Sequence, residues 1–262
     1  MVISSSGAAL ITGASSGIGY EFARLCAADK RSLIVTARNA ESLKQLAAES
    51  REAHGVGVDV IPADLATNAG AKDLVGELER RNITVDILIN NAGFGTHGKF
   101  WENDVEQEQA LLHVNVVSLM LLTRLLLPGM VARGRGRILN VASTAAFVPG
   151  PLMANYYASK AYVLSLSESL SSELRGTGVT VTALCPGPTA TAFQSRAGVK
   201  PSKLADVAGM SAADVARVGY DAMMAGKRVA IPGVKNRLLV GLSRFAPRVA
   251  LLGFVRKLNE SR

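Results

Sequence analysis

Short apolar runs and amphipathic helical stretches alternate along almost the whole chain, and this alternation limits the fold more than any other feature. The runs are rich in β-branched residues and apolar at both odd and even positions, which is typical of strands buried on both faces. Strands that alternate with helices predict a parallel sheet with right-handed crossovers. We therefore predict an α/β, doubly wound fold with a seven-stranded parallel sheet and helices on both faces. The expected strands are Ala8–Thr12, Ser32–Ala37, Val56–Pro62, Ile87–Asn90, Arg137–Ala142, Val179–Leu184 and Arg228–Ile231, and the expected helices are Gly17–Ala28, Ala40–His54, Gly70–Arg81, Asp104–Met130, Asn155–Arg175 and Ala212–Ala225.

Size and composition fit a single domain over residues 1–262, because 48% of the residues are apolar and can fill a sizeable core. Two cysteines are too few for a disulfide framework, and the start of the chain shows no secretory signal. The apolar stretch Val114–Leu127 is shorter and more polar than a bilayer span of about 20 residues. The three histidines lack metal-ligand spacing. We therefore expect a cytoplasmic protein that binds no metal.

A glycine-rich segment, Thr12-Gly-Ala-Ser-Ser-Gly-Ile-Gly19, joins the first expected strand to the first expected helix. Gly13 permits a tight turn, Gly17 lets the backbone approach a pyrophosphate, and Gly19 lets the helix pack closely on the strand. The start of the helix offers N–H groups to phosphates. A glycine-rich turn without a ligand is the alternative, but the strand–loop–helix context favours a Rossmann-type dinucleotide site. The contacts expected from this loop are Gly13, Ser15, Ser16, Gly17, Ile18 and Gly19.

The end of the second expected strand indicates which dinucleotide binds. An NAD site usually has an acid about 20 residues after the glycine loop, where it binds the ribose 2′-hydroxyl. No acid occurs between Lys30 and Ala40, and Arg38 stands there instead. Arg38 can pair with a 2′-phosphate, with Ser15 adding a hydrogen bond. We therefore predict NADP(H) as the cofactor, although a merely solvated Arg38 is the simpler alternative.

Tyr156 and Lys160 lie four residues apart on an expected helix and so share a face. A phenol has a pKa of about 10, and a nearby ammonium would lower it toward the range useful for catalysis. Ser143, at the end of a strand, can hold and polarise a substrate carbonyl. Lys160 can also hydrogen-bond the nicotinamide ribose. These groups predict acid–base chemistry at a carbonyl/alcohol pair.

With these motifs in order, the chain resembles the short-chain dehydrogenases/reductases over nearly its whole length, most closely their DltE-like, broadly specific reductase subgroup. The resemblance implies that Asn115 kinks the long helix and holds a water in a proton relay to Lys160. It also implies that Tyr156, rather than its neighbour Tyr157, is the catalytic tyrosine. The implied catalytic set is Asn115, Ser143, Tyr156 and Lys160. Further cofactor contacts implied by the resemblance are Asp64 and Leu65 at the adenine, Asn91, Ala92 and Gly93 near the adenosine ribose, and Pro186, Gly187, Thr189 and Thr191 near the nicotinamide.

The substrate is expected to be an apolar ketone or aldehyde, because the residues that should face it are mostly apolar. The segment Pro186–Met210 has no clear period, and we interpret residues 187–226 as a substrate loop or lid. Relatives pair their long helices between subunits, so a homodimer or homotetramer is expected. The expected substrate-binding residues are Ser143, Phe94, Ala145, Phe147, Met153 and Phe193, with Val148 and Leu152 beside them.

The last part of the chain is a basic amphipathic tail, residues 233–262. From Lys227 onward there are nine Lys or Arg residues and one acid, Glu260, which accounts for the whole net charge of +8. The rest of the chain is therefore neutral, and no nucleic-acid partner is expected. Pro247 should kink the tail helix or divide it. A helix packed on the domain or on a partner subunit is the favoured interpretation, and peripheral contact with an anionic membrane is the alternative. The apolar stripe consists of Leu238, Leu242, Phe245, Val249 and Leu252.

Two alternatives to a soluble NADP(H)-dependent carbonyl reductase remain at this point. The first is a cofactor-binding regulatory or scaffold protein without catalysis, which the intact catalytic set disfavours. The second is a membrane-surface enzyme that reduces a lipid carbonyl.

Overall fold

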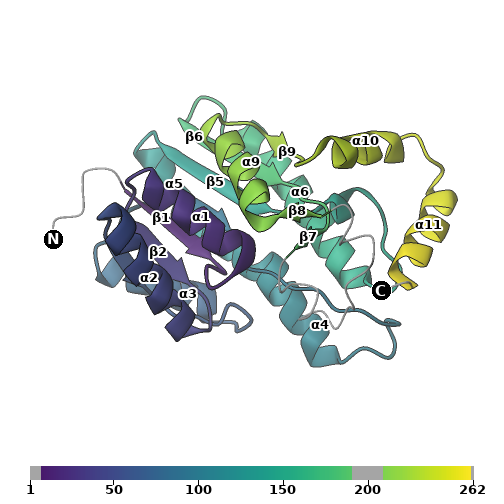
Figure 1. Cartoon of the computed structure of the whole chain (residues 1–262), viewed down its shortest axis with the longest axis horizontal. Coiled ribbons are helices and arrows are strands. Elements are labelled where there is room, and N and C mark those ends of the chain that lie inside the picture. The colour runs from purple at the N-terminus through teal and green to yellow at the C-terminus, as the bar shows by residue number, and fades with distance from the viewer. Residues whose placement is uncertain (1–6, 191–208, 261–262) are drawn as a thin grey trace.

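The computed structural model describes residues 7–190 and 209–260 (Figure 1). Seven strands form one sheet in the order β3-β2-β1-β4-β5-β6-β9, and every neighbouring pair is parallel. This confirms the predicted doubly wound fold. The seven strands are β1 (Ala8–Thr12), β2 (Leu33–Thr36), β3 (Val58–Val60), β4 (Val85–Asn90), β5 (Gly136–Val141), β6 (Val179–Leu184) and β9 (Val229–Ala230).

Helices cover both faces of this sheet because alternate strand residues point to opposite sides. Ile11 packs in one core, against α1 (Gly17–Ala28), α2 (Ala40–His54) and α9 (Ala212–Met224). Its neighbour Leu10 packs in the other core, with residues of α3 (Gly70–Arg80) and α5 (Leu119–Ala132). A third cluster joins α6 (Ala154–Glu173) to the end of β6. Figure 1 shows α1 and α9 lying across the near face of the sheet.

The segment predicted as one helix, Asp104–Met130, is interrupted. It consists of α4 (Val105–Leu112), a π-helical stretch η1 (His113–Ser118) and α5, so the long helix is irregular around Asn115, where the family resemblance implied a kink. The buried amide of Asn115 bonds to the backbone of Phe94 and to Ser159 instead of facing solvent. The run Val105–Ala132 has the length and composition of a membrane span. It also packs on the sheet, with Leu122 and Met130 in the core, as an apolar core helix does.

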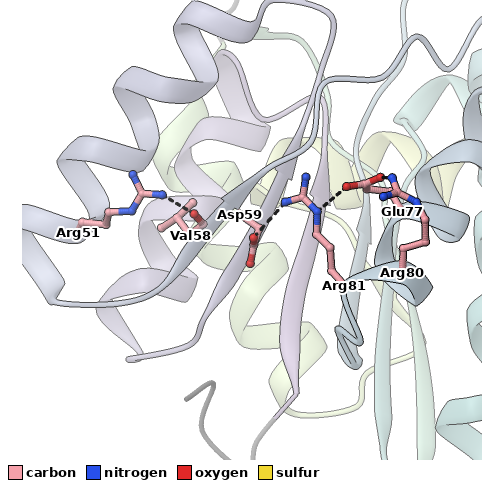
Figure 2. A network of polar contacts seen from close by, with 6 residues as sticks. All are labelled: Arg51, Val58, Asp59, Glu77, Arg80 and Arg81. Carbon is pink, nitrogen blue, oxygen red and sulfur yellow. Dashed lines mark hydrogen bonds and ion pairs between the residues drawn. The ribbon is translucent and has the colours of Figure 1, made fainter. Parts of the chain in front are cut away.

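The strand β3 is the edge strand at one side of the sheet, and polar side chains lie around it (Figure 2). Arg51 of α2 donates to the carbonyl oxygen of Val58, and Arg81 pairs with Asp59 at 3.2 Å and with Glu77. Exposed ion pairs of this kind add little stability. Their effect is to surround the open edge of the sheet with charge, which discourages pairing with another strand.

A chain of buried polar side chains crosses the centre of the sheet. Asn90 Nδ2 donates to Asn140 Oδ1 at 2.9 Å and to Thr123 Oγ1 at 3.1 Å. Asn140 Nδ2 in turn donates to Ser167 Oγ at 2.9 Å. These bonds link α5, β4, β5 and α6, and all four side chains are buried. The two helices that flank the cleft described below are therefore fixed to neighbouring strands.

Two terminal features complete the fold. The ends of the predicted loop Pro186–Met210 pair as a short second sheet, β7 (Thr189–Ala190) with β8 (Met210–Ser211), and residues 191–208 lie outside the described part of the chain. The tail forms α10 (Val234–Ser243) and α11 (Arg248–Glu260), so of the two outcomes predicted at Pro247, a kink or a division, the structure shows the division. We call residues 234–260 the C-terminal arm. Figure 1 shows α10 projecting beyond β9 and α11 following it at an angle.

Replacing Asn140 by alanine should lower the free energy of unfolding by about 2–4 kcal/mol, because the buried Asn90 and Ser167 side chains both lose a partner. Thr182→Val is the control, since the buried Thr182 hydroxyl has no hydrogen-bond partner among the described residues. That variant should keep or gain stability. Urea unfolding of both variants measures the difference, and equal stabilities would remove the role assigned to the buried chain.

Candidate active site

A cleft of about 2040 Å³ opens at the carboxyl ends of β1, β4, β5 and β6. Ligands bind at this edge in open α/β sheets. Gly19 and Asn115 lie behind its wall rather than on it, and Thr191 and Phe193 lie outside the described residues. The cleft brings together the remaining predicted site residues: Gly13, Ser15, Ser16, Gly17, Ile18, Arg38, Asp64, Leu65, Asn91, Ala92, Gly93, Phe94, Ser143, Ala145, Phe147, Met153, Tyr156, Lys160, Pro186, Gly187 and Thr189.

The glycine turn has the backbone geometry that a phosphate cradle needs. Gly13 and Gly17 have φ angles of +66° and +58°, which side chains other than glycine rarely adopt. A Cβ at Gly19 would lie 2.4 Å from the Gly13 carbonyl oxygen, so only glycine lets α1 start this close to β1. No side-chain cap occupies the start of α1 within the described residues, and its first turn contains no acid. Its N–H groups and positive dipole end therefore suit an anionic ligand.

Asn91 and Thr12 fix this turn to the end of β4. Thr12 Oγ1 accepts from the backbone nitrogens of Asn91 and Ala92 at 3.0 and 2.9 Å. The amide of Asn91 donates to the carbonyl oxygens of Thr12 at 2.9 Å and of Gly13 at 3.2 Å. The predicted contact residues Asn91 and Ala92 thus hold the turn in place and also line the cleft.

The far end of the cleft suits an adenosine 2′-phosphate. Arg38 is exposed on the cleft wall and takes part in no ion pair among the described residues. Asp64 Oδ1 accepts from the Ala66 backbone nitrogen at 3.0 Å. The carbonyl oxygen of Leu65 accepts from Ser118 Oγ at 2.7 Å, which connects this wall to the start of α5. An unpaired guanidinium beside an open cleft is available to an anion.

Tyr156, Lys160 and Ser143 meet at the opposite end. Lys160 Nζ lies 5.8 Å from the centroid of the Tyr156 ring and donates to the Val141 carbonyl oxygen at 2.8 Å. Ser143 Oγ lies 3.4 Å from the Pro186 carbonyl oxygen, and all three side chains line the cleft. Tyr157 also lines it, but its hydroxyl donates to Asn259 Oδ1 at 3.4 Å. The arrangement favours Tyr156 over Tyr157 as the partner of the lysine.

Gly93 separates the amide of Asn115 from the ammonium of Lys160. A Cβ on residue 93 would lie 3.0 Å from Asn115 Oδ1 and 3.4 Å from Lys160 Nζ. Both polar groups therefore border one small space, which the missing side chain leaves open. The relay role predicted for Asn115 requires such a space beside Lys160.

Lys160 is buried, with 5% of its surface exposed. Burial lowers the pKa of its ammonium from 10.5 to about 8. Burial raises the pKa of the neighbouring Cys185 thiol to about 12, so that thiol carries no charge near neutrality. Lys160 is therefore mostly protonated at pH 7, but it loses its proton more easily than an exposed lysine does.

Sequence reasoning missed two contributors to the site. The buried carboxylate of Glu108 on α4 accepts, at 2.7 Å each, from Thr96, Asn103 and Asn155, and so joins the loop after β4 to the start of α6, beside Tyr156. His97 also lines the cleft, and its Nε2 lies 2.9 Å from the carbonyl oxygen of Asn259. Nothing in the local pattern marks these contacts, because their partners are far apart in the chain or follow an irregular loop.

Apolar side chains line the cleft near Tyr156, and its outer wall comes from a segment that the sequence analysis did not place there. Phe94, Ala145, Phe147, Val148 and Met153 line the cleft. Leu152 does not line it; its backbone is left-handed, with φ +66°, and its carbonyl oxygen accepts from the Gly98 nitrogen. The C-terminal arm forms the outer wall with Val234, Leu239, Leu242, Leu251, Phe254, Val255 and Leu258.

The depressed pKa of Lys160 makes stability depend on pH. Above pH 10.5 the amine is neutral in both states, and as the pH falls toward 8 the unfolded chain binds the proton first, so folding stability is lost. Lys160→Met removes this loss. Its free energy of unfolding relative to wild type should therefore rise by about 2–3 kcal/mol between pH 10 and pH 7.

The exposed lysine variant Lys44→Met serves as the control and should show no such rise. Chemical unfolding at several pH values makes the comparison. A parallel pH dependence of wild type and Lys160→Met would contradict a buried ammonium.

Comparison with known proteins identifies the family. A family model described as short chain dehydrogenase matches residues 7–201. The ketoacyl reductase HetN from Nostoc sp. is 35% identical over 178 residues, covering 68% of this chain and 62% of that protein. A very-long-chain 3-oxoacyl-CoA reductase from Phaeosphaeria nodorum is 39% identical over 183 residues, covering 66% of this chain and 52% of that protein. The chain thus spans only part of the length of these relatives.

Solved structures of similar proteins cover more of the chain. A short-chain dehydrogenase from Sphingobium yanoikuyae in complex with NADPH has a TM-score of 0.82 at 32% identity, covering 92% of this chain and 94% of that one. A bulky-bulky ketone specific alcohol dehydrogenase from Comamonas testosteroni has a TM-score of 0.77 at 30% identity, with 92% of each chain covered. A family protein from Burkholderia phymatum in complex with NAD has a TM-score of 0.80 at 27% identity, covering 92% and 94%. The chain belongs to the short chain dehydrogenase family of oxidoreductases, as its motifs predicted.

Proposed function

We propose that this protein is an NADPH-dependent reductase that converts an apolar ketone or aldehyde to the alcohol. The observation that carries the proposal is one cleft lined by a glycine turn fit for phosphates, by Arg38, and by Ser143, Tyr156 and Lys160. The relatives named ketoacyl and 3-oxoacyl-CoA reductases, and the ketone-specific neighbour, support a carbonyl substrate. The DltE-like subgroup, a homo-oligomeric assembly and a cytoplasmic location stay predictions.

The cofactor fits residues at both ends of the cleft. The start of α1 and the glycine turn would hold the pyrophosphate, and Arg38 with Ser15 would hold the 2′-phosphate. Asp64 and Leu65 would border the adenine, and Pro186, Gly187 and Thr189 would lie along the nicotinamide. When bound, NADPH supplies the hydride for the carbonyl carbon.

The side chains of this chain handle the proton and the orientation of the substrate. Ser143 Oγ donates a hydrogen bond to the carbonyl oxygen and polarises it. Tyr156 then transfers its phenolic proton to that oxygen as the alcohol forms. The Lys160 ammonium stabilises the phenolate that remains, because an opposite charge nearby favours the ionised form. Asn115 and the space beside Gly93 give Lys160 a route for proton replacement.

Several features make the substrate end suitable for an apolar compound. Its lining includes Phe94, Phe147, Val148 and Met153, and the arm adds further leucine and phenylalanine side chains. Apolar pockets bind apolar bodies and leave orientation to a few polar groups. Here Ser143 and Tyr156 would orient the carbonyl group.

Arg38→Gln should raise the KM for NADPH about tenfold to a hundredfold, because a charge-assisted contact with the 2′-phosphate is lost. The KM for NADH should hardly change, since NADH lacks that phosphate. Arg24→Gln is the matched control, because exposed Arg24 pairs with Glu21 on the outside of α1 and does not line the cleft. Equal increases in the KM for NADPH and for NADH would contradict a contact between Arg38 and the 2′-phosphate.

Tyr156→Phe should lower kcat for any carbonyl substrate by about a hundredfold to ten-thousandfold, the usual contribution of a general acid. NADPH binding, followed by fluorescence, should persist. Tyr157→Phe is the control, since its hydroxyl contacts Asn259, and its effect on kcat should be far smaller. If Tyr157→Phe caused the larger loss, the roles of the two tyrosines would have to be exchanged.

A further inference from the structure

The C-terminal arm is fixed to the domain near its two ends. A Cβ at Gly187 would lie 2.6 Å from the side chain of Asn236, so α10 begins in close contact with the cleft wall. At the other end Asn259 is fully buried, and its amide donates to the Pro151 carbonyl oxygen at 2.8 Å. The arm is therefore a defined part of the fold.

Between these ends the arm exposes an unusual amount of apolar surface. Eight of the fifteen large apolar side chains that are exposed in the described residues lie in this arm. Phe245 is 88% exposed and Val249 is 82% exposed. Single exposed apolar residues are ordinary, but a contiguous group marks an interaction surface. The group consists of Val234, Leu238, Leu239, Leu242, Phe245, Val249, Leu252 and Phe254.

Exposed cations alternate with this apolar group along the arm. Six Lys or Arg side chains lie in the arm, and all are exposed. The single acid of the arm, Glu260, already pairs with Arg256 at 2.7 Å. Arg244 and Arg248 lie on either side of Phe245 in the sequence. The six are Lys235, Arg237, Arg244, Arg248, Arg256 and Lys257.

The charge argues against a second copy of this chain as the occupant. A two-fold interface brings the same patch of both subunits together, so it would oppose cations to cations with one acid per copy. A partner with negative charge above an apolar layer fits better. An anionic phospholipid surface has both, and basic amphipathic helices bind such surfaces.

The exposed apolar group continues into the cleft. Leu239, Leu242 and Phe254 are exposed and also line the cleft wall, whereas Leu238, Phe245 and Val249 lie outside it. Apolar surface therefore runs around the arm from its outer side to the substrate end. The family-model match ends at residue 201, so the arm lies outside it.

We propose that the C-terminal arm docks this protein on anionic phospholipid membranes, and that the cleft receives a lipophilic carbonyl substrate from that surface. Docking stands independently of catalysis, while delivery of the substrate rests on the proposed reductase function. Phe245 and Val249 insert among the lipid chains, and Arg244 and Arg248 contact the phosphates. The mouth of the cleft then faces the membrane.

Co-sedimentation of the full chain with vesicles tests docking. Wild type should bind vesicles of phosphatidylcholine mixed with phosphatidylglycerol, and added salt should weaken binding by screening. Phe245→Ser/Val249→Ser should lower binding at least about tenfold, because two apolar side chains no longer leave water. Arg244→Gln/Arg248→Gln should lower it about tenfold or more on these vesicles, and hardly at all on phosphatidylcholine alone.

Val105→Ser/Val218→Ser is the matched control, with two exposed valines removed from α4 and α9. It should bind vesicles as wild type does. Turnover of a water-soluble ketone without vesicles should be unchanged in Phe245→Ser/Val249→Ser, which separates failure of docking from failure of catalysis.

The docking proposal is overturned if wild type does not bind the anionic vesicles. It is overturned as well if Val105→Ser/Val218→Ser loses as much vesicle binding as Phe245→Ser/Val249→Ser. It is also overturned if sedimentation velocity shows that Phe245→Ser/Val249→Ser dissociates an oligomer while vesicle binding stays as in wild type. That result would show that the apolar group forms an interface with a second copy of this chain.

Discussion

The hydrogen bonds between Thr12 and Asn91 hold the site together, because they fix the end of β1 to the end of β4 at one point. The glycine turn begins at that point, and α1 starts immediately beyond it. If the turn moved, the start of α1 would no longer face the cleft. The position of the cofactor relative to Tyr156 thus depends on two short polar contacts between neighbouring strands.

Further polar side chains lie buried behind this turn. An unpaired polar group is costly when buried, so these side chains favour one arrangement of the surrounding segments. Asn115, Glu108 and Lys160 each have hydrogen-bond partners on a different segment of the chain. Asn115 and Glu108 couple the interrupted long helix to the helix that carries Tyr156, and Lys160 connects that helix to β5. A buried ammonium with a pKa near 8 reduces stability at neutral pH. This loss of stability occurs where the ammonium of Lys160 lies beside the phenol of Tyr156.

The sequence predicted the features that short-range physics determines. Strand ends at Thr12 and Leu184 and the helix from Gly17 to Ala28 agree with the structure, because periodicity and glycine spacing act locally. The family resemblance implied a kink at Asn115, but its π-helical form was not predicted, since Asn115 bonds to Phe94 in the loop after β4. The tail was recognised as basic and amphipathic, but its place on the cleft wall follows from long-range packing at Asn259. Local pattern carries no signal for such contacts.

The central claim is that one cleft holds NADPH between Arg38 and Tyr156. A crystal structure of the complex with NADP⁺ tests it most directly. We expect the pyrophosphate at the start of α1, the 2′-phosphate beside Arg38, and the nicotinamide within reach of Tyr156 and Ser143. A dinucleotide bound elsewhere, or one bound in the cleft with its nicotinamide remote from Tyr156, would contradict it.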